Sequence, residues 1–377
     1  MYIKNVKIHK VRNLSNISIP ISTNDEMRHL IITGANGSGK TSLLEAIREY
    51  CHSAVEASNL DIDSSKTKFY DIELDFACGL DDIRASFENG DFLLAYFGAR
   101  HEFFASQPDS IKITQLNKQY EMGNSARIVF LEYLLDLKAK EAFSINNGKK
   151  EKAEQIKRWF ERFRDILRDI YDDKELSLEF EEDSYRFLIQ TKGHDPFDLN
   201  SASDGFSSII DIIAEITLRM TGTKGLSFSF DKAGIVLIDE LETHLHLELQ
   251  RKIFGYLTKL FPRLQFIVTT HSPFVLAGAE NAVIYDLENK ILVNGGLSNV
   301  PYSGIVEGYF KADELSDTLR SKFERYSVLA KKKNISDAEI EEISDLEFYL
   351  DEIPDYLALG LTTEYSRLKR EFYERGE

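Results

Sequence analysis

Cysteine and long apolar runs are scarce in this chain of 377 residues. Cys51 and Cys78 are its two cysteines, and neither lies in a CxxC or Cys/His pattern. This excludes a disulfide framework and a structural zinc site, and it favours a reducing compartment. No run approaches the roughly 18 consecutive apolar residues that span a bilayer. The first residues, MYIKNVKIHKVRN, contain no apolar signal core. We therefore expect a cytoplasmic protein.

Positive charge is also sparse, with 46 Lys and Arg against 63 Asp and Glu and a net charge of −17. Sequence-independent wrapping of DNA depends on Lys and Arg that neutralise phosphates, so this charge balance argues against such wrapping. It does not exclude a local basic patch. The excess of acids favours solubility, or a protein partner with a basic surface. The absence of internal repeats argues against solenoids and propellers.

The most informative motif is the segment GANGSGKT at residues 34–41. It matches GxxxxGK[ST], and it lies between an apolar run and an amphipathic helical pattern. Glycines allow consecutive backbone N–H groups to turn inward, and the helix N-terminus attracts phosphate. We predict that ATP phosphates bind along this loop, with Lys40 on the β- and γ-phosphates and the Thr41 hydroxyl on Mg²⁺. The loop residues predicted to contact the nucleotide are Gly34, Asn36, Gly37, Ser38, Gly39, Lys40 and Thr41.

Two later strand patterns end in polar residues that suit the same chemistry. The run GIVLID leads into Asp239 and Glu240. In a P-loop ATPase the first acid holds Mg²⁺ and the second acts as general base on the attacking water. The run IVTT then ends at His271, which is placed to donate a hydrogen bond to the γ-phosphate. Taken alone, these residues also fit a solvated acidic turn and a structural histidine. Their order and spacing after the glycine loop favour catalysis.

The remaining pattern alternates between strands and helices. Strands are predicted at residues 2–9, 17–21, 29–33, 70–76, 82–88, 91–97, 176–181, 185–190, 234–239 and 265–269. Helices are predicted at residues 42–51, 126–142, 150–171, 206–219 and 246–260, and in a charged tail from about residue 311. Ser336-Asp337-Ala338-Glu339 reads as a capping box in that tail. Trp159 is expected on the apolar side of its helix.

Together these blocks resemble the ABC-type ATPases of the RecF/SMC/OLD group. Asn36 within the glycine loop and the opening IKNVKIHKVRNLSNISI are typical of that group. The resemblance implies that Ser203-Asp204-Gly205 is the signature sequence, in the Ser-x-Gly form of the OLD-like branch. Ser203 and Gly205 would then contact the γ-phosphate bound by a second subunit. Without the resemblance, the same three residues are simply a good helix N-cap.

The resemblance also assigns two loops. Residues 242–246 fall at the D-loop, which crosses the dimer interface in this group. Residues 96–100 fall at the Q-loop, but no glutamine stands there. Arg100 or His101 would have to act near the phosphates instead, or else serve a structural or solvent-facing role.

The fold that follows is an α/β P-loop NTPase of ABC-ATPase type. It has a mixed β-sheet, an antiparallel N-terminal β-subdomain, a helical insertion and a helical C-terminal tail. We expect an ATPase domain at residues 1–300, with the insertion at about 105–175, and a helical region at residues 301–377. The insertion is too short for a coiled-coil arm of the SMC kind. The tail is too short and too helical for the nuclease domain of OLD proteins.

The resemblance is strongest to short OLD-like ATPases of bacterial anti-phage systems, such as PARIS, retron and Septu systems. It implies an ATPase that uses ATP and Mg²⁺, forms a homodimer or higher homo-oligomer through its ATP sites, and controls a separate, nuclease-like effector protein. The alternative is a RecF-like repair or recombination ATPase that binds DNA directly. The long insertion and the OLD-like signature fit the cytosolic ATPase of a membrane transporter less well. No membrane partner is expected.

Overall fold

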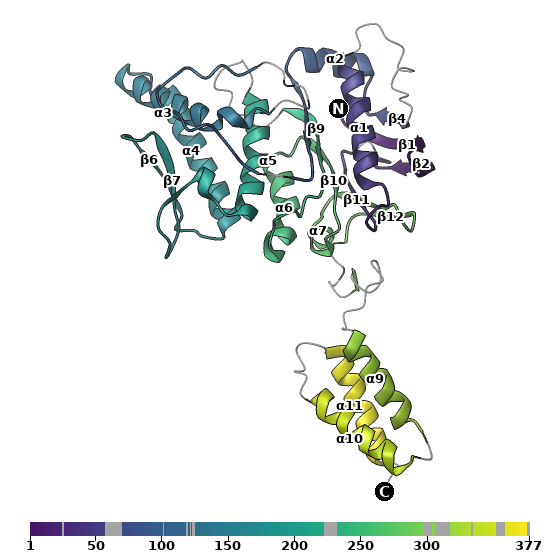
Figure 1. Cartoon of the computed structure of the whole chain (residues 1–377). Helices are drawn as coiled ribbons and strands as arrows, with labels where there is room; N and C mark the ends of the chain where they lie inside the picture. Colours follow the sequence, from purple (N-terminus) through teal and green to yellow (C-terminus); the bar gives the residue numbers. More distant parts are fainter. Residues whose placement is uncertain are drawn as a thin grey trace. The chain divides into compact units, whose positions relative to one another are not determined.

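The computed structural model describes residues 1–24, 26–56, 70–100, 102–117, 120, 122, 125–221, 232–297, 300, 304–305, 317–332, 335–351 and 359–374. The chain divides into two compact units, Met1–Tyr302 and Ser303–Glu377. The strands of all the described sheets lie in the first unit, and the second is helical, as Figure 1 shows. Within the described residues, no helix is long and apolar enough to cross a membrane.

A six-stranded sheet forms the centre of the first unit, in the order β12-β11-β3-β10-β9-β5. All neighbouring strands from β11 to β5 in this order pair in parallel, whereas β12 pairs antiparallel with β11. The strands are β3 (His29–Thr33), β5 (Phe92–Phe97), β9 (Ala233–Ile238), β10 (Leu264–Thr269), β11 (Ala282–Asp286) and β12 (Ile291–Asn294). Every residue of β3 and β10 is buried, as expected for parallel strands covered on both faces. The predicted α/β class with a mixed sheet is confirmed.

The parallel direction of these strands brings three predicted motifs to one edge. The carboxyl ends of β3, β10 and β9 are neighbours in the sheet. The glycine loop follows β3, Asp239 follows β9, and His271 comes two residues after the end of β10. Ligands of open α/β sheets bind outside this edge.

An antiparallel sheet packs beside the first, as the sequence predicted. It has the order β2-β1-β4, formed by β1 (Ile3–Val11), β2 (Leu14–Pro20) and β4 (Tyr70–Phe76). Helix α1 (Lys40–Glu56) lies between the two sheets in Figure 1, and its apolar side chains belong to the core that both sheets share. The buried Gln265 side chain on β10 accepts a hydrogen bond from Ile3 N at 2.7 Å and donates one to Ile3 O at 2.9 Å. These bonds tie the N-terminal strand to the ATPase sheet.

One predicted strand is wrong. Residues 82–88 belong to helix α2 (Leu80–Glu88). Ile83 and Phe87 are buried four residues apart, whereas Ala85, which alternation would also bury, is exposed. Asp81 and Asp82 lie in the first turn, where carboxylates favour the helix dipole. The local pattern fitted both periods, and the first-turn acids together with tertiary burial selected the helical one.

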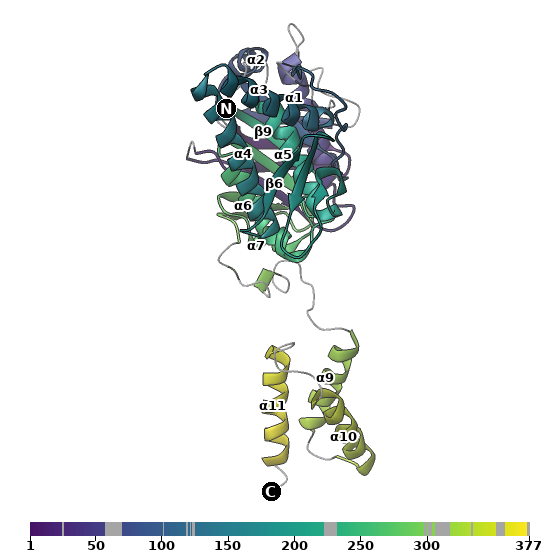
Figure 2. The ribbon, with the colours of Figure 1, turned by 90° about the vertical axis from the view of Figure 1, so that its left-hand side faces the viewer.

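The segment between β5 and β9 builds a separate layer. It contains η2 (Arg127–Val129), α3 (Phe130–Asn146), α4 (Lys150–Tyr171), β6 (Ser177–Glu181), β7 (Arg186–Gln190), β8 (Phe197–Asp198), η3 (Leu199–Ser201) and α5 (Asp204–Thr221). Residues 105–117 are not helical, so the helices of this segment begin later than the expected insertion. Trp159 is 5% exposed and stacks on Phe163, as its place on the apolar side predicted. Figure 2 shows α3, α4 and β6 in front of the central sheet.

After β9 the chain returns to the central sheet. Helix α6 (Leu247–Leu260) connects β9 to β10, and the short helix α7 (Pro273–Ala277) precedes β11. The second unit contains α9 (Asp317–Ala330), α10 (Asp337–Asp351) and α11 (Leu359–Glu374) around a small core that includes Tyr326 and Leu350. At the start of α10, Glu339 accepts a hydrogen bond from Ser336 N at 3.0 Å, so this half of the predicted capping box forms.

Candidate functional site

The glycine loop follows β3 and leads into α1, which begins at Lys40. Gly34, Gly37 and Gly39 have φ values of 137°, 81° and 103°, a region that residues with side chains rarely adopt. A Cβ at Gly34 would also lie 2.9 Å from Ser38 Oγ. The backbone therefore requires glycine for the turn that points N–H groups toward a bound phosphate.

Lys40 is 6% exposed and is held inside the loop. Its Nζ donates hydrogen bonds to the carbonyl oxygens of Gly34 and Ala35, each at 2.9 Å. Burial lowers the pKa of Lys40, while the carboxylates of Glu240 and Asp239 act in the opposite direction. The Lys40 ammonium group is therefore partly desolvated and close to carboxylates. A phosphate would compete with the two carbonyl oxygens for this group, because charge-assisted hydrogen bonds are stronger than those to neutral acceptors.

The two predicted magnesium ligands lie together. Thr41 Oγ1 donates a hydrogen bond to Asp239 Oδ1 at 3.3 Å, although 198 residues separate them in sequence. Asp239 is 2% exposed. Within the described ranges, no cluster of three or more His, Cys, Asp or Glu side chains could hold a metal by itself. One hydroxyl and one carboxylate nevertheless fit Mg²⁺, which takes its other ligands from phosphates and water.

Thr269, at the end of β10, connects both acids of the β9 strand end. Its hydroxyl donates to Asp239 Oδ1 at 2.6 Å and accepts a hydrogen bond from Glu240 N at 2.7 Å. Its carbonyl accepts from Leu241 N at 3.1 Å. Glu240 adopts a left-handed backbone with φ of 51°, which these contacts stabilise. Thr269 was not predicted as a site residue; its position two residues before the predicted histidine was the available signal.

His271 lies at the same edge, and Glu242 holds its backbone. The His271 N–H donates a hydrogen bond to Glu242 Oε1. The other carboxylate oxygen, Glu242 Oε2, is buried and has no hydrogen-bond partner among the described residues. Burial lowers the pKa of His271, and the nearby Lys40 charge lowers it further, against the opposing effect of Glu242 and Glu240. A neutral imidazole suits a hydrogen-bond donor to phosphate. Glu242 belongs to the segment 242–246 assigned to the D-loop, and its link to His271 was not predicted from the sequence.

Ser203 lies at the N-terminus of α5, away from the glycine loop. Its side chain is exposed, and its carbonyl accepts the first helical bond from Ser207 N at 2.8 Å. Helix α5 packs beside β5, and β9 and β10 separate β5 from β3. At roughly 4.8 Å per strand, three spacings correspond to about 14 Å. The structure therefore leaves Ser203 displaced laterally from Lys40, at an exposed helix N-terminus where an anion is favourable.

Gly205 packs closely on the loop predicted as the D-loop. A Cβ at this position would lie 2.9 Å from the carbonyl oxygen of His244. His244 itself has φ of 64°, and the ring of His246 contacts Phe206 edge to face. The beginning of α5 and residues 242–246 are therefore one packed surface.

Four further residues bear on the comparison with the sequence. Arg100 is exposed, and His101 lies outside the described residues. Glu288 was not predicted; its Oε2 accepts a hydrogen bond from Ala35 N at 3.2 Å, which helps to hold the loop. Ser38 Oγ is buried, and within the described residues it has no hydrogen-bond partner.

Comparison with known proteins agrees with this geometry. The family model AAA_21, described as "AAA domain, putative AbiEii toxin, Type IV TA system", matches residues 30–277. The fold and the site define a P-loop ATPase. The chain belongs to the AAA_21 family.

Among curated relatives, the chain is 33% identical over 184 residues to the Septu protein PtuA of Bacillus mycoides (strain KBAB4), which covers 47% of this chain and 24% of that protein. It is 36% identical over 127 residues to the Retron Ec83 probable ATPase of Escherichia coli, covering 33% of this chain and 23% of that protein. The chain thus spans about a quarter of the length of these two relatives. A Septu protein PtuA of Bacillus thuringiensis is 26% identical over 381 residues, covering 93% of this chain and 90% of that protein.

Among solved structures, the chain is similar to an SMC head bound to the C-terminal winged-helix domain of ScpA. The TM-score is 0.44 at 15% identity, covering 79% of this chain and 99% of that chain.

Proposed function

We propose that this protein is an ATPase whose hydrolytic site is shared between two copies of the chain. The observation that supports it is the cluster of Lys40, Thr41, Asp239 and Thr269 at one sheet edge, with Ser203 exposed and displaced along that edge. One copy supplies the phosphate loop and the acids. The other supplies the N-terminus of α5.

Each residue has a distinct task in this proposal. Lys40 exchanges its two carbonyl partners for phosphate oxygens. Thr41 and Asp239 hold Mg²⁺, which when bound neutralises phosphate charge and polarises the reacting phosphoryl group. Glu240 accepts the proton of the attacking water, and Thr269 sets the direction of its backbone. His271, neutral at pH 7, donates a hydrogen bond to the γ-phosphate. Ser203 of the second copy contacts the same phosphate from the opposite side.

The biological role we propose is anti-phage defence, in which this ATPase holds and releases a separate effector protein. Relatives named as Septu proteins and as a retron ATPase support it. ATP binding closes the pair of subunits, and hydrolysis opens it, which changes how the effector is held. The net charge of −17 disfavours the alternative of direct DNA binding as the main activity.

A mixing experiment tests the shared site. Lys40→Ala removes the phosphate contact, and Ser203→Arg blocks the proposed contact from the second copy, so each variant alone is expected to lose ATP hydrolysis. A heterodimer of the two variants retains one intact site, formed by Lys40 of one chain and Ser203 of the other. An equal mixture is therefore expected to recover about a quarter of the wild-type rate, if sites are independent and subunits exchange freely.

The control is a mixture of Lys40→Ala with Asp239→Ala, which both damage the same half of the site and restore nothing. Nucleotide binding by Ser203→Arg, measured with a fluorescent ATP analogue, is expected to persist. An unchanged hydrolysis rate in Ser203→Arg, or no recovery in the first mixture under conditions where native mass spectrometry detects the heterodimer, rejects the shared site.

A further inference from the structure

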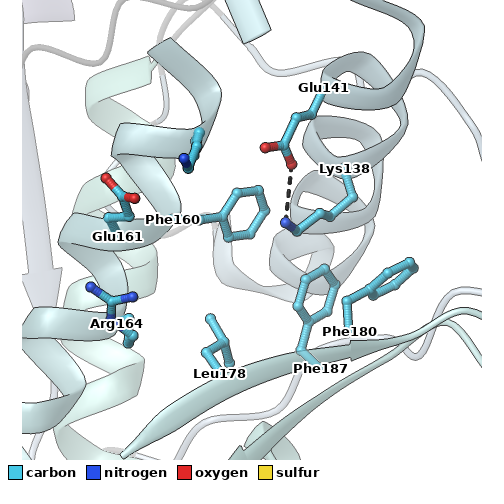
Figure 3. Close-up of a pocket in the computed structure, with 9 residues that line it drawn as sticks. Lys138, Glu141, Phe160, Glu161, Arg164, Leu178, Phe180 and Phe187 are labelled. Atoms are coloured by element: carbon cyan, nitrogen blue, oxygen red, sulfur yellow. Dashed lines mark hydrogen bonds and ion pairs between the residues drawn. The ribbon is translucent and has the colours of Figure 1, made fainter. Parts of the chain in front are cut away.

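A pocket of about 230 Å³ lies where α3, α4 and the β6–β7 hairpin meet, in the segment between β5 and α5 (Figure 3). None of its residues belongs to the ATP site described above. Pockets that hold cofactors or drug-sized molecules usually measure about 300–1,000 Å³. This pocket is smaller, so its size suits one large side chain.

The floor of the pocket is aromatic. Phe160 of α4 stacks on Phe187 of β7 with centroids 6.0 Å apart, and Phe180 of β6 contacts Phe187 at 5.0 Å. Leu178 lies two residues before Phe180 and lines the same pocket. Figure 3 shows these four side chains around a common space between the helices and the hairpin. An apolar group placed there would gain aromatic contacts and lose contact with water.

The rim of the pocket is charged and carries more cations than carboxylates. Its cations are Lys138, Lys157 and Arg164, and its carboxylates are Glu141 and Glu161. Lys138 lies 4.2 Å from the Phe160 ring centroid and forms an ion pair with Glu141 at 3.0 Å. Lys157 is exposed, and no ion pair joins it to another described side chain. This positive excess is local, because the whole chain has a charge of −17.

The pocket also borders a free strand edge. The small sheet has the order β6-β7-β8, so β6 is an outer strand, and no described strand pairs with its other side. Phe180 pairs directly with Phe187 across the hairpin, so the Leu178 and Phe180 side chains share the pocket face. The exposed residues Glu179 and Glu181 alternate with them. A peptide strand added to this edge would place every second side chain on the pocket face.

We infer that the β6 edge and this pocket together form the docking site for an extended segment of the effector protein. The segment pairs its backbone with β6, inserts one aromatic or large aliphatic side chain into the pocket, and presents a carboxylate to Lys157. The main-chain bonds supply affinity and the pocket supplies specificity. This inference rests on the proposed function, since it names where the separate effector binds.

The test uses the full chain co-expressed with the proteins encoded by its two flanking genes. The complex is purified and identified by native mass spectrometry, and affinity is then measured by biolayer interferometry with the separately purified partner. Leu178→Trp fills the pocket with an apolar ring, and Lys157→Glu reverses the free rim charge. Each is expected to weaken the complex by about tenfold or more. Neither is expected to change basal ATP hydrolysis.

Two matched controls separate docking from general damage. Glu179→Trp adds the same ring to the neighbouring β6 position on the opposite face. Lys152→Glu reverses an exposed charge on α4 outside the pocket. Both controls are expected to bind the partner like the wild type. Cross-linking mass spectrometry is expected to join Lys157 to an Asp- or Glu-containing segment of the partner that also carries a large apolar residue.

Several outcomes overturn the inference. A complex that forms equally well with Leu178→Trp and Lys157→Glu rejects the docking site while leaving effector control intact. Equal weakening by the controls also rejects it. A change in homo-oligomer size assigns the pocket to a second copy, and selective loss of binding to a labelled single-stranded oligonucleotide assigns it to nucleic acid. If no flanking protein binds the wild type, effector control fails together with this site, whereas the mixing experiment on ATP hydrolysis remains unaffected.

Discussion

The Thr269 hydroxyl donates a 2.6 Å hydrogen bond to Asp239 Oδ1, and the same hydroxyl accepts the N–H of Glu240 at 2.7 Å. Thr269 is fully buried, and it joins the ends of two neighbouring strands. One hydroxyl group therefore orients the carboxylate proposed for the metal and the backbone of the proposed general base. Both contacts depend on the oxygen atom and would be absent from a valine of nearly the same shape.

Thr269→Val is expected to lower kcat for ATP hydrolysis by about 100-fold, because misplacing catalytic groups by about 1 Å costs roughly that factor. The Kd for ATP is expected to change little, since Lys40 and the loop backbone are untouched. Thr269→Ser keeps the hydroxyl and is expected to restore most of kcat. Steady-state kinetics and a thermal melt of each variant provide the measurement. A purely structural role for Thr269 would lower stability and leave kcat of the folded protein intact.

Glu240→Gln is expected to reduce hydrolysis by about 10²–10⁴-fold, the usual contribution of a general base. Its left-handed backbone and its bond to Thr269 involve the main chain, so the variant keeps the local geometry. ATP binding is expected to persist and to accumulate the closed, subunit-paired state, detectable by size-exclusion chromatography with ATP and Mg²⁺. Glu248→Gln, which changes an exposed acid in the first turn of α6, is the control and is expected to leave hydrolysis unchanged. Normal turnover in Glu240→Gln would exclude Glu240 as the base.

His271 is expected to titrate below its ordinary pKa of 6.5, because burial and then the Lys40 charge both disfavour the imidazolium. At pH 7 the ring is therefore neutral. Lys40→Met removes the repelling charge and is expected to raise the pKa of His271, whereas Lys10→Met, exposed on β1, leaves it unchanged. The measurement is a pH titration of the labelled histidine ring by NMR, without added nucleotide. A lower or equal pKa in Lys40→Met contradicts the proximity of the two groups.

His29 provides a prediction on stability. It is 4% exposed, its Nδ1 accepts a hydrogen bond from Phe266 N at 3.1 Å, and burial lowers its pKa from 6.5 to about 4. The unfolded chain therefore binds a proton at a higher pH than the folded protein does. Protonation of His29 therefore favours the unfolded state. As pH falls from about 6.5 to 4, the free energy of unfolding decreases by about 3 kcal/mol.

His29→Asn keeps a hydrogen-bond acceptor and removes the titrating ring. Its free energy of unfolding is expected to fall less steeply than that of the wild type between pH 6.5 and pH 4. Urea unfolding followed by Trp159 fluorescence at several pH values measures the difference between the two slopes. Parallel slopes would show that His29 is protonated in the folded protein or titrates normally.

The sequence alone was sufficient to propose the glycine loop as a phosphate site and the strand-end acids as its partners. Their requirements are local: a glycine turn between a strand and a helix, and carboxylates directly after a buried strand. The same holds for α4, whose predicted bounds of 150–171 agree with Lys150–Tyr171, because its apolar positions recur with one helical period. Local pattern was insufficient at residues 82–88, where strand and helix periods both fitted and burial of Ile83 and Phe87 decided for the helix.

The residues that support the site became apparent only in the folded chain. The hydrogen-bond partners of Thr269 and Glu242 lie 29 positions away in sequence, and the partner of Glu288 lies 253 positions away. The local sequence pattern around these residues does not indicate such partners. The lateral displacement of Ser203 from Lys40 likewise follows from strand order, which places β10 and β9 between β3 and β5. The conformation of the glycine loop and its phosphate-binding groups depend on residues that are adjacent in sequence. Hydrogen bonds between strand ends depend on how the whole sheet is assembled, and so they emerge only with the fold.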